Sequence, residues 1–161
     1  MARVTDVYLG LGGNIGDSEG AVRRAADEIR QLIGVEGAIL SHLYRTAPVS
    51  PLPQPFYTNA AMRLRTSLNA TELLHELQRI EYRLGKRPKP KEAPRIIDID
   101  IILFGMERHA LPHLEIPHPR WEERLFVLRP LLDLTERLAT PGPPPREVEL
   151  TSLIEALAAP K

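Results

Sequence analysis

The chain contains no cysteine, which excludes disulfide bonds, thiolate metal sites and cysteine nucleophiles. It also carries no formal net charge, because 21 Lys and Arg residues balance 21 Asp and Glu residues. A general electrostatic attraction to nucleic acid or to an anionic membrane is therefore not expected. No apolar run approaches the roughly 20 residues needed to span a bilayer. No secretory signal opens the sequence, so we expect a cytoplasmic protein.

What is present suits a single folded unit. A chain of 161 residues with 43% apolar residues can build one substantial core, and we predict one domain over residues 1–161. The 16 prolines tend to fall between the predicted elements, most densely in residues 45–55, where no regular element is expected.

Apolar periodicity predicts strands at residues 7–11, 38–44, 56–64 and 96–104, with two helices between them. Asp17 is expected to cap the first helix, which ends at Gly34, and Asn69 to open the second with a capping box. The expected buried stripes are Val22, Ala25, Ala26, Ile29 and Ile33, and then Leu73, Leu77, Ile80 and Leu84. An amphipathic segment at 121–132 and a short last helix complete the prediction.

The order strand–helix–strand–strand–helix–strand predicts an α+β protein. We expect a ferredoxin-like split βαβ core with a mainly antiparallel sheet and added C-terminal helices.

Two carboxylates lie inside the strongest predicted strand. Asp98 and Asp100 are two residues apart, so they share one face of the strand at roughly 7 Å between Cα atoms. The opposite face is expected to hold Ile97, Ile99, Ile101 and Leu103. Because the carboxylates repel each other, they favour a cationic partner, such as two Mg²⁺ ions about 3.5–4 Å apart. The alternative is that each Asp pairs with an arginine or faces water.

A basic segment precedes this strand, formed by Arg83, Lys86, Arg87, Lys89, Lys91 and Arg95. Such donors bind phosphate esters, and arginine does so bidentately. The alternative is a solvated charged loop. A cationic loop beside a carboxylate pair is typical of phosphoryl transfer from a nucleotide.

Other residues extend the candidate site. Tyr57 and Asn59 share a strand face and, with Phe126, are suited to a flat heterocycle, although aromatic residues also fill cores. His118, between two prolines, is suited to a phosphate contact or to a turn. A zinc site of His109, His113 and His118 is disfavoured by their spacing. The glycines between 10 and 16 resemble a dinucleotide-binding turn, but isoleucine occupies position 15, where the pattern needs glycine.

Taken together, these segments resemble the 6-hydroxymethyl-7,8-dihydropterin pyrophosphokinases of folate synthesis. The resemblance is carried, from Val7 to about Asp133, by Tyr8-Leu9-Gly10-Leu11-Gly12-Gly13-Asn14, Tyr44-Arg45-Thr46-Ala47-Pro48, Gln54-Pro55-Phe56-Tyr57-Thr58-Asn59-Ala60-Ala61, Gln78-Arg79-Ile80-Glu81, residues 94–105, Ile116-Pro117-His118-Pro119-Arg120 and Arg124-Leu125-Phe126-Val127-Leu128. Residues 91–95 lack the tryptophan that some relatives carry before the arginine.

The resemblance implies an ATP donor, two Mg²⁺ ions, a hydroxymethyl dihydropterin acceptor, AMP as the leaving group and a monomeric enzyme. It implies that Asp98 and Asp100 bind both metals and act in catalysis with Lys86 and Arg95. The implied ATP-binding residues are Gln78, Glu81, Lys86, Arg95, Ile101, His118 and Arg124. The implied pterin-binding residues are Thr46, Ala47, Val49, Tyr57, Asn59 and Phe126. Loops 12–16, 45–55 and 86–94 would close over the substrates.

Two other functions remain open from the residues alone. One is a ferredoxin-like module that binds a heterocycle without catalysis. The other is a metal-dependent nucleotide hydrolase that needs no pterin acceptor.

Overall fold

The computed structural model describes residues 3–47, 53, 55–88 and 95–160. Its main sheet has the order β2-β4-β1-β5, with β3 also paired to β4, and every pairing is antiparallel. The strands are β1 (Thr5–Gly13), β2 (Val35–Leu40), β3 (Tyr44–Thr46), β4 (Tyr57–Thr66) and β5 (Asp98–Phe104). The predicted α+β class and the mainly antiparallel sheet are confirmed.

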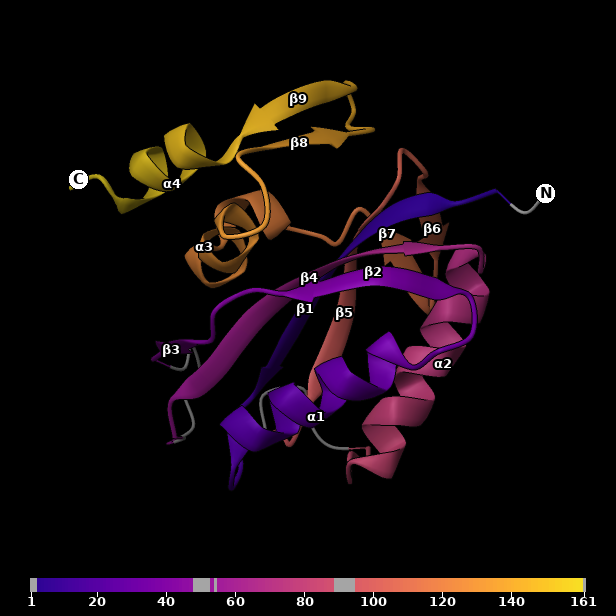
Figure 1. Ribbon diagram of the computed structural model, residues 1–161. Helices are drawn as coiled ribbons and strands as arrows, with labels where there is room; N and C mark the ends of the chain where they lie inside the picture. The colour runs from indigo at the N-terminus through magenta and orange to yellow at the C-terminus, as the bar shows by residue number, and fades with distance from the viewer. Residues whose placement is uncertain (1–2, 48–52, 54, 89–94, 161) are drawn as a thin grey trace.

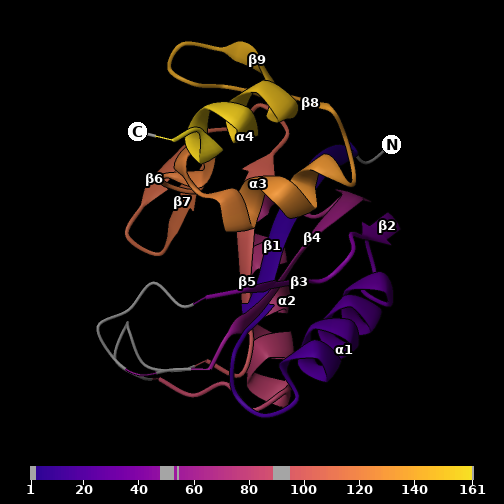
Figure 2. The same ribbon diagram turned by 90° about the vertical axis from the view of Figure 1, so that its left-hand side faces the viewer.

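Helices cover both faces of this sheet (Figure 1). Helices α1 (Ser18–Arg30) and α2 (Ala70–Arg83) pack on one face over the larger apolar cluster, which includes Leu9 and Met62. The 3₁₀ turn η1 (Trp121–Glu123) and helix α3 (Leu125–Leu132) lie on the other face. In the view of Figure 2, α3 runs across the strands, and α4 (Leu150–Ala158) packs against it from above.

Two hairpins that the sequence analysis did not predict complete the chain. They are β6 (His109–Leu111) with β7 (Leu114–Ile116), and β8 (Arg137–Thr140) with β9 (Arg146–Glu149). Their strands have three or four residues each, too few to show a period in the sequence. No helix in the described part of the chain combines the length and apolarity needed to cross a membrane.

The predicted helix starts are confirmed. The Asp17 side chain accepts a hydrogen bond from the Gly20 amide at 2.9 Å, and Asn69 and Glu72 form the reciprocal capping box. The predicted stripe of α1 is wrong at Ile33, which is 94% exposed. The helix ends at Arg30, so residues beyond it no longer follow helical spacing as the chain turns toward β2 at Gly34.

The strand predicted over 38–44 is two strands, because the pairing changes at Ser41. The Ser41 amide donates to the Ala61 carbonyl at 2.9 Å, but the Ala61 amide donates to the Ser41 hydroxyl, also at 2.9 Å. A side chain therefore replaces a backbone carbonyl in the ladder. The chain leaves the regular sheet for His42 and Leu43 and rejoins it at Tyr44.

Strand β5 contains a bulge that the alternating pattern does not reveal. Its partners on β1 step from Leu9 with Ile101 to Tyr8 with Leu103, which leaves Ile102 as the extra residue. As a result Leu103 packs beside Ile102 in the α3-side cluster. The prediction that Leu103 shares a face with Ile97, Ile99 and Ile101 is wrong. Those three are buried as predicted, in the larger apolar cluster beneath α1 and α2, which we call the helix-side core.

The glycine-rich segment is not a dinucleotide-binding turn. That motif requires parallel strands, and β1 is antiparallel to both of its neighbours. The glycines instead lie along a central strand and the turn that follows it.

Candidate active site

The carboxylate pair lies on the α3 side of the sheet, beside residues of two neighbouring strands. In the ladder, Gly12 of β1 lies directly between Asn59 of β4 and Asp98 of β5. The next row on the same face places Gly10 between Ala61 and Asp100. Because glycine has no side chain, the central strand leaves room between the amide of Asn59 and the carboxylate of Asp98. A Cβ at position 12 would lie 2.9 Å from the Asn59 Oδ1 atom.

Asp98 pairs with a lysine instead of the arginine that the sequence alternative allowed. The Lys86 Nζ atom lies 2.6 Å from Asp98 Oδ1 and 3.0 Å from Glu81 Oε2. Burial lowers the pKa of Lys86, but the hydrogen bonds and charges of Asp98 and Glu81 outweigh burial and raise it. Lys86 is therefore a charged side chain that links α2 to β5.

Glu81 is buried at the base of this group. Its Oε2 atom accepts a hydrogen bond at 2.7 Å from the backbone amide of Ile99, the residue between the two aspartates. The same oxygen also accepts from Lys86. Burial raises the pKa of Glu81, while the Ile99 amide and Lys86 oppose that shift. In this structure the Glu81 carboxylate holds β5 in place.

Asp100 is more open than Asp98 and less well compensated. Its side chain is 54% exposed, and His118 Nε2 lies 4.0 Å from its Oδ2 atom. The pKa of Asp100 is raised by surrounding protein and by the charge of Asp98, and His118 and Lys86 counteract this. The exposure of the Asp100 side chain and the raised pKa of its carboxyl group are compatible, because a recessed carboxylate that protein atoms surround can still contact solvent. A carboxylate with surplus negative charge favours a bound cation.

His118 is held in this position by the backbone. Its amide donates to the Ile102 carbonyl at 2.9 Å, and Nδ1 lies 3.0 Å from the Pro119 carbonyl oxygen. Nε2 therefore faces Asp100. His118 thus lies beside the aspartate strand, and its phosphate contact stays a prediction.

Asn14 joins two chain segments at the end of β1, and the sequence analysis gave it no role. The Asn14 side-chain oxygen accepts from the backbone amide of Arg95 at 2.8 Å. The backbone amide of Asn14 donates to the Arg95 carbonyl, also at 2.8 Å. Its side-chain NH₂ donates to the Pro55 carbonyl at 3.3 Å. The adjacent Gly13 packs so closely that a Cβ would lie 2.3 Å from the Ile96 carbonyl oxygen. The signal available in the sequence was an Asn directly after a glycine run, and the structure shows that this Asn is buried.

Tyr57, Asn59 and Thr46 lie close together, as the resemblance implies. The buried Asn59 donates from Nδ2 to the Thr46 hydroxyl at 2.6 Å. The pKa of Tyr57 is raised by burial and by the charge of Asp98, and Arg95 counteracts this. The Tyr57 hydroxyl thus lies within electrostatic reach of Asp98 and Arg95.

The remaining predicted residues lie in different places. Phe126 lies in the first turn of α3, with the Arg124 guanidinium 5.7 Å from its ring centre. Gln78 is exposed on α2, whereas the Ile101 side chain is buried in the helix-side core, away from Asp100. Ala47 is exposed at the end of β3, and Val49 lies outside the described residues.

A cleft of about 350 Å³ lies beside this site, and neither Asp98 nor Asp100 lines it. It is lined by residues that include Asn14, Ser18, Arg45, Phe56 and Thr58. Thr58 alternates with Tyr57 and Asn59 along β4, so it faces α1 and hydrogen-bonds Ser18.

The donor set indicates which metal could bind. Among the described residues no group of three or more His, Cys, Asp or Glu side chains is gathered to hold a metal ion. His109, one of the three histidines considered for zinc, pairs with Glu107 at 2.8 Å. Asp98 and Asp100 supply hard carboxylate oxygens at a partly open position, which suits Mg²⁺ that keeps water and substrate phosphate ligands.

Comparison with known proteins shows that the chain is similar to pyrophosphokinases. It matches the 7,8-dihydro-6-hydroxymethylpterin-pyrophosphokinase (HPPK) family over residues 8–136. It is 40% identical over 131 residues to the 2-amino-4-hydroxy-6-hydroxymethyldihydropteridine pyrophosphokinase of Bacillus subtilis, covering 81% of this chain and 78% of that protein. The Pseudomonas aeruginosa protein of the same name is 36% identical over 135 residues, covering 84% of this chain and 83% of that protein. With a match that spans most of its length, the chain belongs to the HPPK family.

Proposed function

We propose that the protein transfers the pyrophosphoryl group of ATP to the hydroxymethyl group of 6-hydroxymethyl-7,8-dihydropterin, releasing AMP, in folate biosynthesis. The observation that carries this proposal is the placement of Asn59 and Asp98 on either side of Gly12, in a chain of the HPPK family. The Asn59 amide, suited to the edge of a heterocycle, is thus separated by one strand, β1, from the Asp98 carboxylate, suited to a phosphate-bound cation.

The pterin would occupy the side of the site formed by Tyr57, Asn59 and Thr46, with Phe126 on the facing helix. Aromatic rings can stack on the flat heterocycle, and the Asn59 amide can pair with its polar edge. Backbone groups near Ala47 would complete this pocket, and we extend the proposal to Val49.

The ATP phosphates would lie over β5, between cationic groups from separate elements. Lys86, Arg95, His118 and Arg124 would offset the negative charge of the phosphate oxygens. We retain Gln78 as a nucleotide contact from α2. Ile101 could take part only through its backbone, because its side chain is in the core. Glu81 would act through Lys86 and β5, since its carboxylate already accepts two hydrogen bonds.

We propose that Asp98 and Asp100 bind two Mg²⁺ ions, which accompany ATP. Magnesium at these carboxylates would neutralise phosphate charge and lower the pKa of the attacking hydroxyl group.

In the reaction the hydroxymethyl oxygen forms a bond to the β-phosphorus of ATP, and the bond from that phosphorus to the α–β bridging oxygen breaks. AMP leaves with the bridging oxygen, and the hydroxyl proton passes to solvent. Asn59 and Tyr57 would orient the acceptor, while Lys86 and Arg95 would hold the donor in line. No side chain among the described residues needs to act as a general base in this scheme.

We also infer that the core is of the ferredoxin-like split βαβ kind. The order β2-β4-β1-β5, with α1 and α2 on one face, supports this. We propose in addition that residues 1–161 form one domain and that the protein acts as a monomer in the cytoplasm.

The decisive experiment measures AMP released from ATP and Mg²⁺, with and without 6-hydroxymethyl-7,8-dihydropterin. We expect AMP only when the pterin is present, and no AMP after addition of EDTA. Phosphate or pyrophosphate release without pterin would support a nucleotide hydrolase instead. Pterin binding without any AMP would reduce the protein to a binding module and overturn the proposal.

A further inference from the structure

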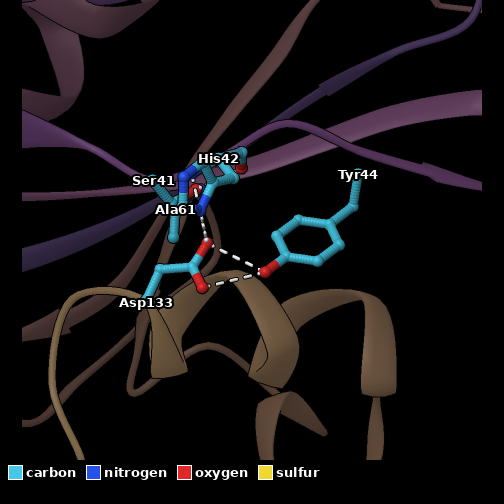
Figure 3. Close-up of polar contacts among 5 residues, drawn as sticks. All are labelled: Ser41, His42, Tyr44, Ala61 and Asp133. Carbon is cyan, nitrogen blue, oxygen red and sulfur yellow. Dashed lines mark hydrogen bonds and ion pairs between the residues drawn. The ribbon is translucent and has the colours of Figure 1, made fainter.

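A polar cluster joins the end of helix α3 to the break between β2 and β3 (Figure 3). The break follows Ser41, whose hydroxyl accepts from the Ala61 amide and donates to the His42 carbonyl at 2.7 Å. His42 and Leu43 therefore leave the ladder, and Tyr44 begins β3.

Asp133 holds both sides of this break from the C-terminal end of α3. Its carboxylate accepts from the His42 amide at 3.1 Å and from the Tyr44 hydroxyl at 2.9 Å to each oxygen. The exposed His42 ring adds a contact at 3.2 Å. The Asp133 side chain is only 21% exposed, so its hydrogen bonds are partly shielded from water. Figure 3 shows the carboxylate facing both donors.

The cluster connects two segments that the proposed function places around the pterin. β3 begins at Tyr44 and carries Thr46, whose hydroxyl accepts from Asn59. α3 ends beside Asp133 and carries Phe126 in its first turn, about 10 Å away along the helix axis. The Tyr44–Asp133 contact therefore joins the strand of Thr46 to the helix of Phe126.

We propose that Asp133 is a positioning residue that sets the spacing between the Thr46 and Phe126 sides of the pterin site, through Tyr44 and the His42 amide. This inference rests on the proposed function. Asp133 would touch neither substrate. Its effect would be larger on the pterin than on ATP, because Glu81, Lys86 and Asn14 hold most of the ATP-binding side separately. Of the proposed ATP-binding residues, Arg124 adjoins α3.

The contact is not needed to attach α3 to the sheet. Leu128 and Leu131 of α3 are fully buried in the α3-side cluster, and Arg63 of β4 donates to the Leu134 carbonyl at 3.5 Å. Removing the Tyr44 hydroxyl should therefore leave α3 docked, but freer to shift relative to β3. A loss of pterin affinity without loss of folding is the expected signature.

The test uses Tyr44→Phe, Asp133→Asn and the double variant in the full chain. We expect each single variant to raise the KM for the pterin by about fivefold to tenfold, as loss of a hydrogen bond to a charged group predicts. The KM for ATP should rise by less than twofold, because Arg124 is the assigned ATP-binding residue that adjoins α3, and kcat should stay close to wild type. The double variant should be no worse than the poorer single variant, because both single variants weaken the same contact between Tyr44 and Asp133.

Two further variants separate positioning from general packing. Tyr8→Phe is a matched control, since Tyr8 packs partly buried against the same α3-side cluster. It should leave the pterin KM unchanged. Asp133→Glu keeps the carboxylate and should recover part of the affinity that Asp133→Asn loses. Thermal unfolding of every variant confirms that the protein measured is folded.

The outcomes distinguish this inference from the proposed function. An active wild type with unchanged pterin KM in folded Tyr44→Phe and Asp133→Asn would overturn the inference alone. Equal rises in the KM values of pterin and ATP would also overturn it, because they indicate a general structural role. A wild type that makes no pterin-dependent AMP would overturn the proposed function and this inference with it.

Discussion

The α3 side of the main sheet has a covered half and an open half, built on the same strands. In the covered half, Ile102 and Leu103 of β5 are each 2% exposed beneath α3 and its neighbours. In the open half, two residues away on the same strand, the Asp100 side chain is 54% exposed. One strand thus serves as core at one end and as a candidate active site at the other.

The bulge at Ile102 marks the boundary between the halves. It places Ile102 and Leu103 in the same cluster, so β5 presents two successive apolar side chains to α3. Before the bulge, regular alternation keeps the aspartates on the open side and the isoleucines in the helix-side core. The extra residue therefore permits full coverage on one side of the boundary without turning the carboxylates inward.

The largest contrast is expected from Asp100→Ala in the open half. Turnover should fall by about a thousandfold, or about 4 kcal/mol of transition-state stabilisation, because a metal-holding carboxylate is lost. Stability should change little, since the side chain is exposed and its charge is poorly compensated. Measurements of kcat and of thermal unfolding check both parts. Near-normal turnover would contradict the assignment of the carboxylate pair.

The converse variant is Leu128→Ala in the covered half. Leu128 is 0% exposed, so the free energy of unfolding should fall by about 2–5 kcal/mol. Turnover per folded molecule should be preserved, because Leu128 does not face the carboxylates. Urea unfolding gives the first quantity and active-site titration the second. A large loss of kcat in the folded protein would show that the two halves are not independent.

Two glycines of β1, one beside Asp98 and one nearer the boundary beside Asp100, form a matched pair. In Gly12→Ala the new Cβ would lie 2.9 Å from Asn59 Oδ1, so we expect Asn59 to shift and the pterin KM to rise about tenfold. In Gly10→Ala the Cβ would meet Ile102 Cδ1 at 3.3 Å, which should cost about 1 kcal/mol of stability or less.

Steady-state KM values and urea unfolding of both glycine variants separate these effects. The same rise in pterin KM for Gly10→Ala and Gly12→Ala would remove the distinction between the two rows.

The smallest effect concerns Tyr44, at the edge of both halves. Its pKa is raised from its ordinary value of 10.0, first by burial and then by the Asp133 contact. The folded state therefore keeps the hydroxyl proton to higher pH than the unfolded state does. The stabilising contribution, about 1 kcal/mol or less, should be complete below pH 10.0 and be lost as pH rises through the folded pKa.

Comparison with Tyr44→Phe isolates this contribution, because every other titrating group is common to the two proteins. The difference in the free energy of unfolding should narrow at alkaline pH and then reverse, as the ionised phenol meets the Asp133 carboxylate. A difference that is constant up to high pH would contradict this assignment of the hydroxyl donor.

Much of the fold could be predicted from the sequence where near neighbours determine it. The caps at Asp17 and Asn69 depend on residues within one helical turn, and both are present. The apolar alternation around Asp98 and Asp100 correctly separates the two faces of β5 before the bulge. The prediction fails at Ile33 and at Ser41, where the chain leaves a regular element and periodicity no longer applies.

By itself, the amino-acid sequence determined the chemistry of this protein: a carboxylate pair in an apolar strand, a basic segment before it and an aromatic and amide pair on another strand. Only the tertiary structure decided how these meet. The register across Gly12, the pairing of Lys86 with Asp98 and the contact of Asp133 with Tyr44 join residues far apart in the chain. Such contacts depend on strand register and helix docking, which packing of the whole core sets and which no local pattern records.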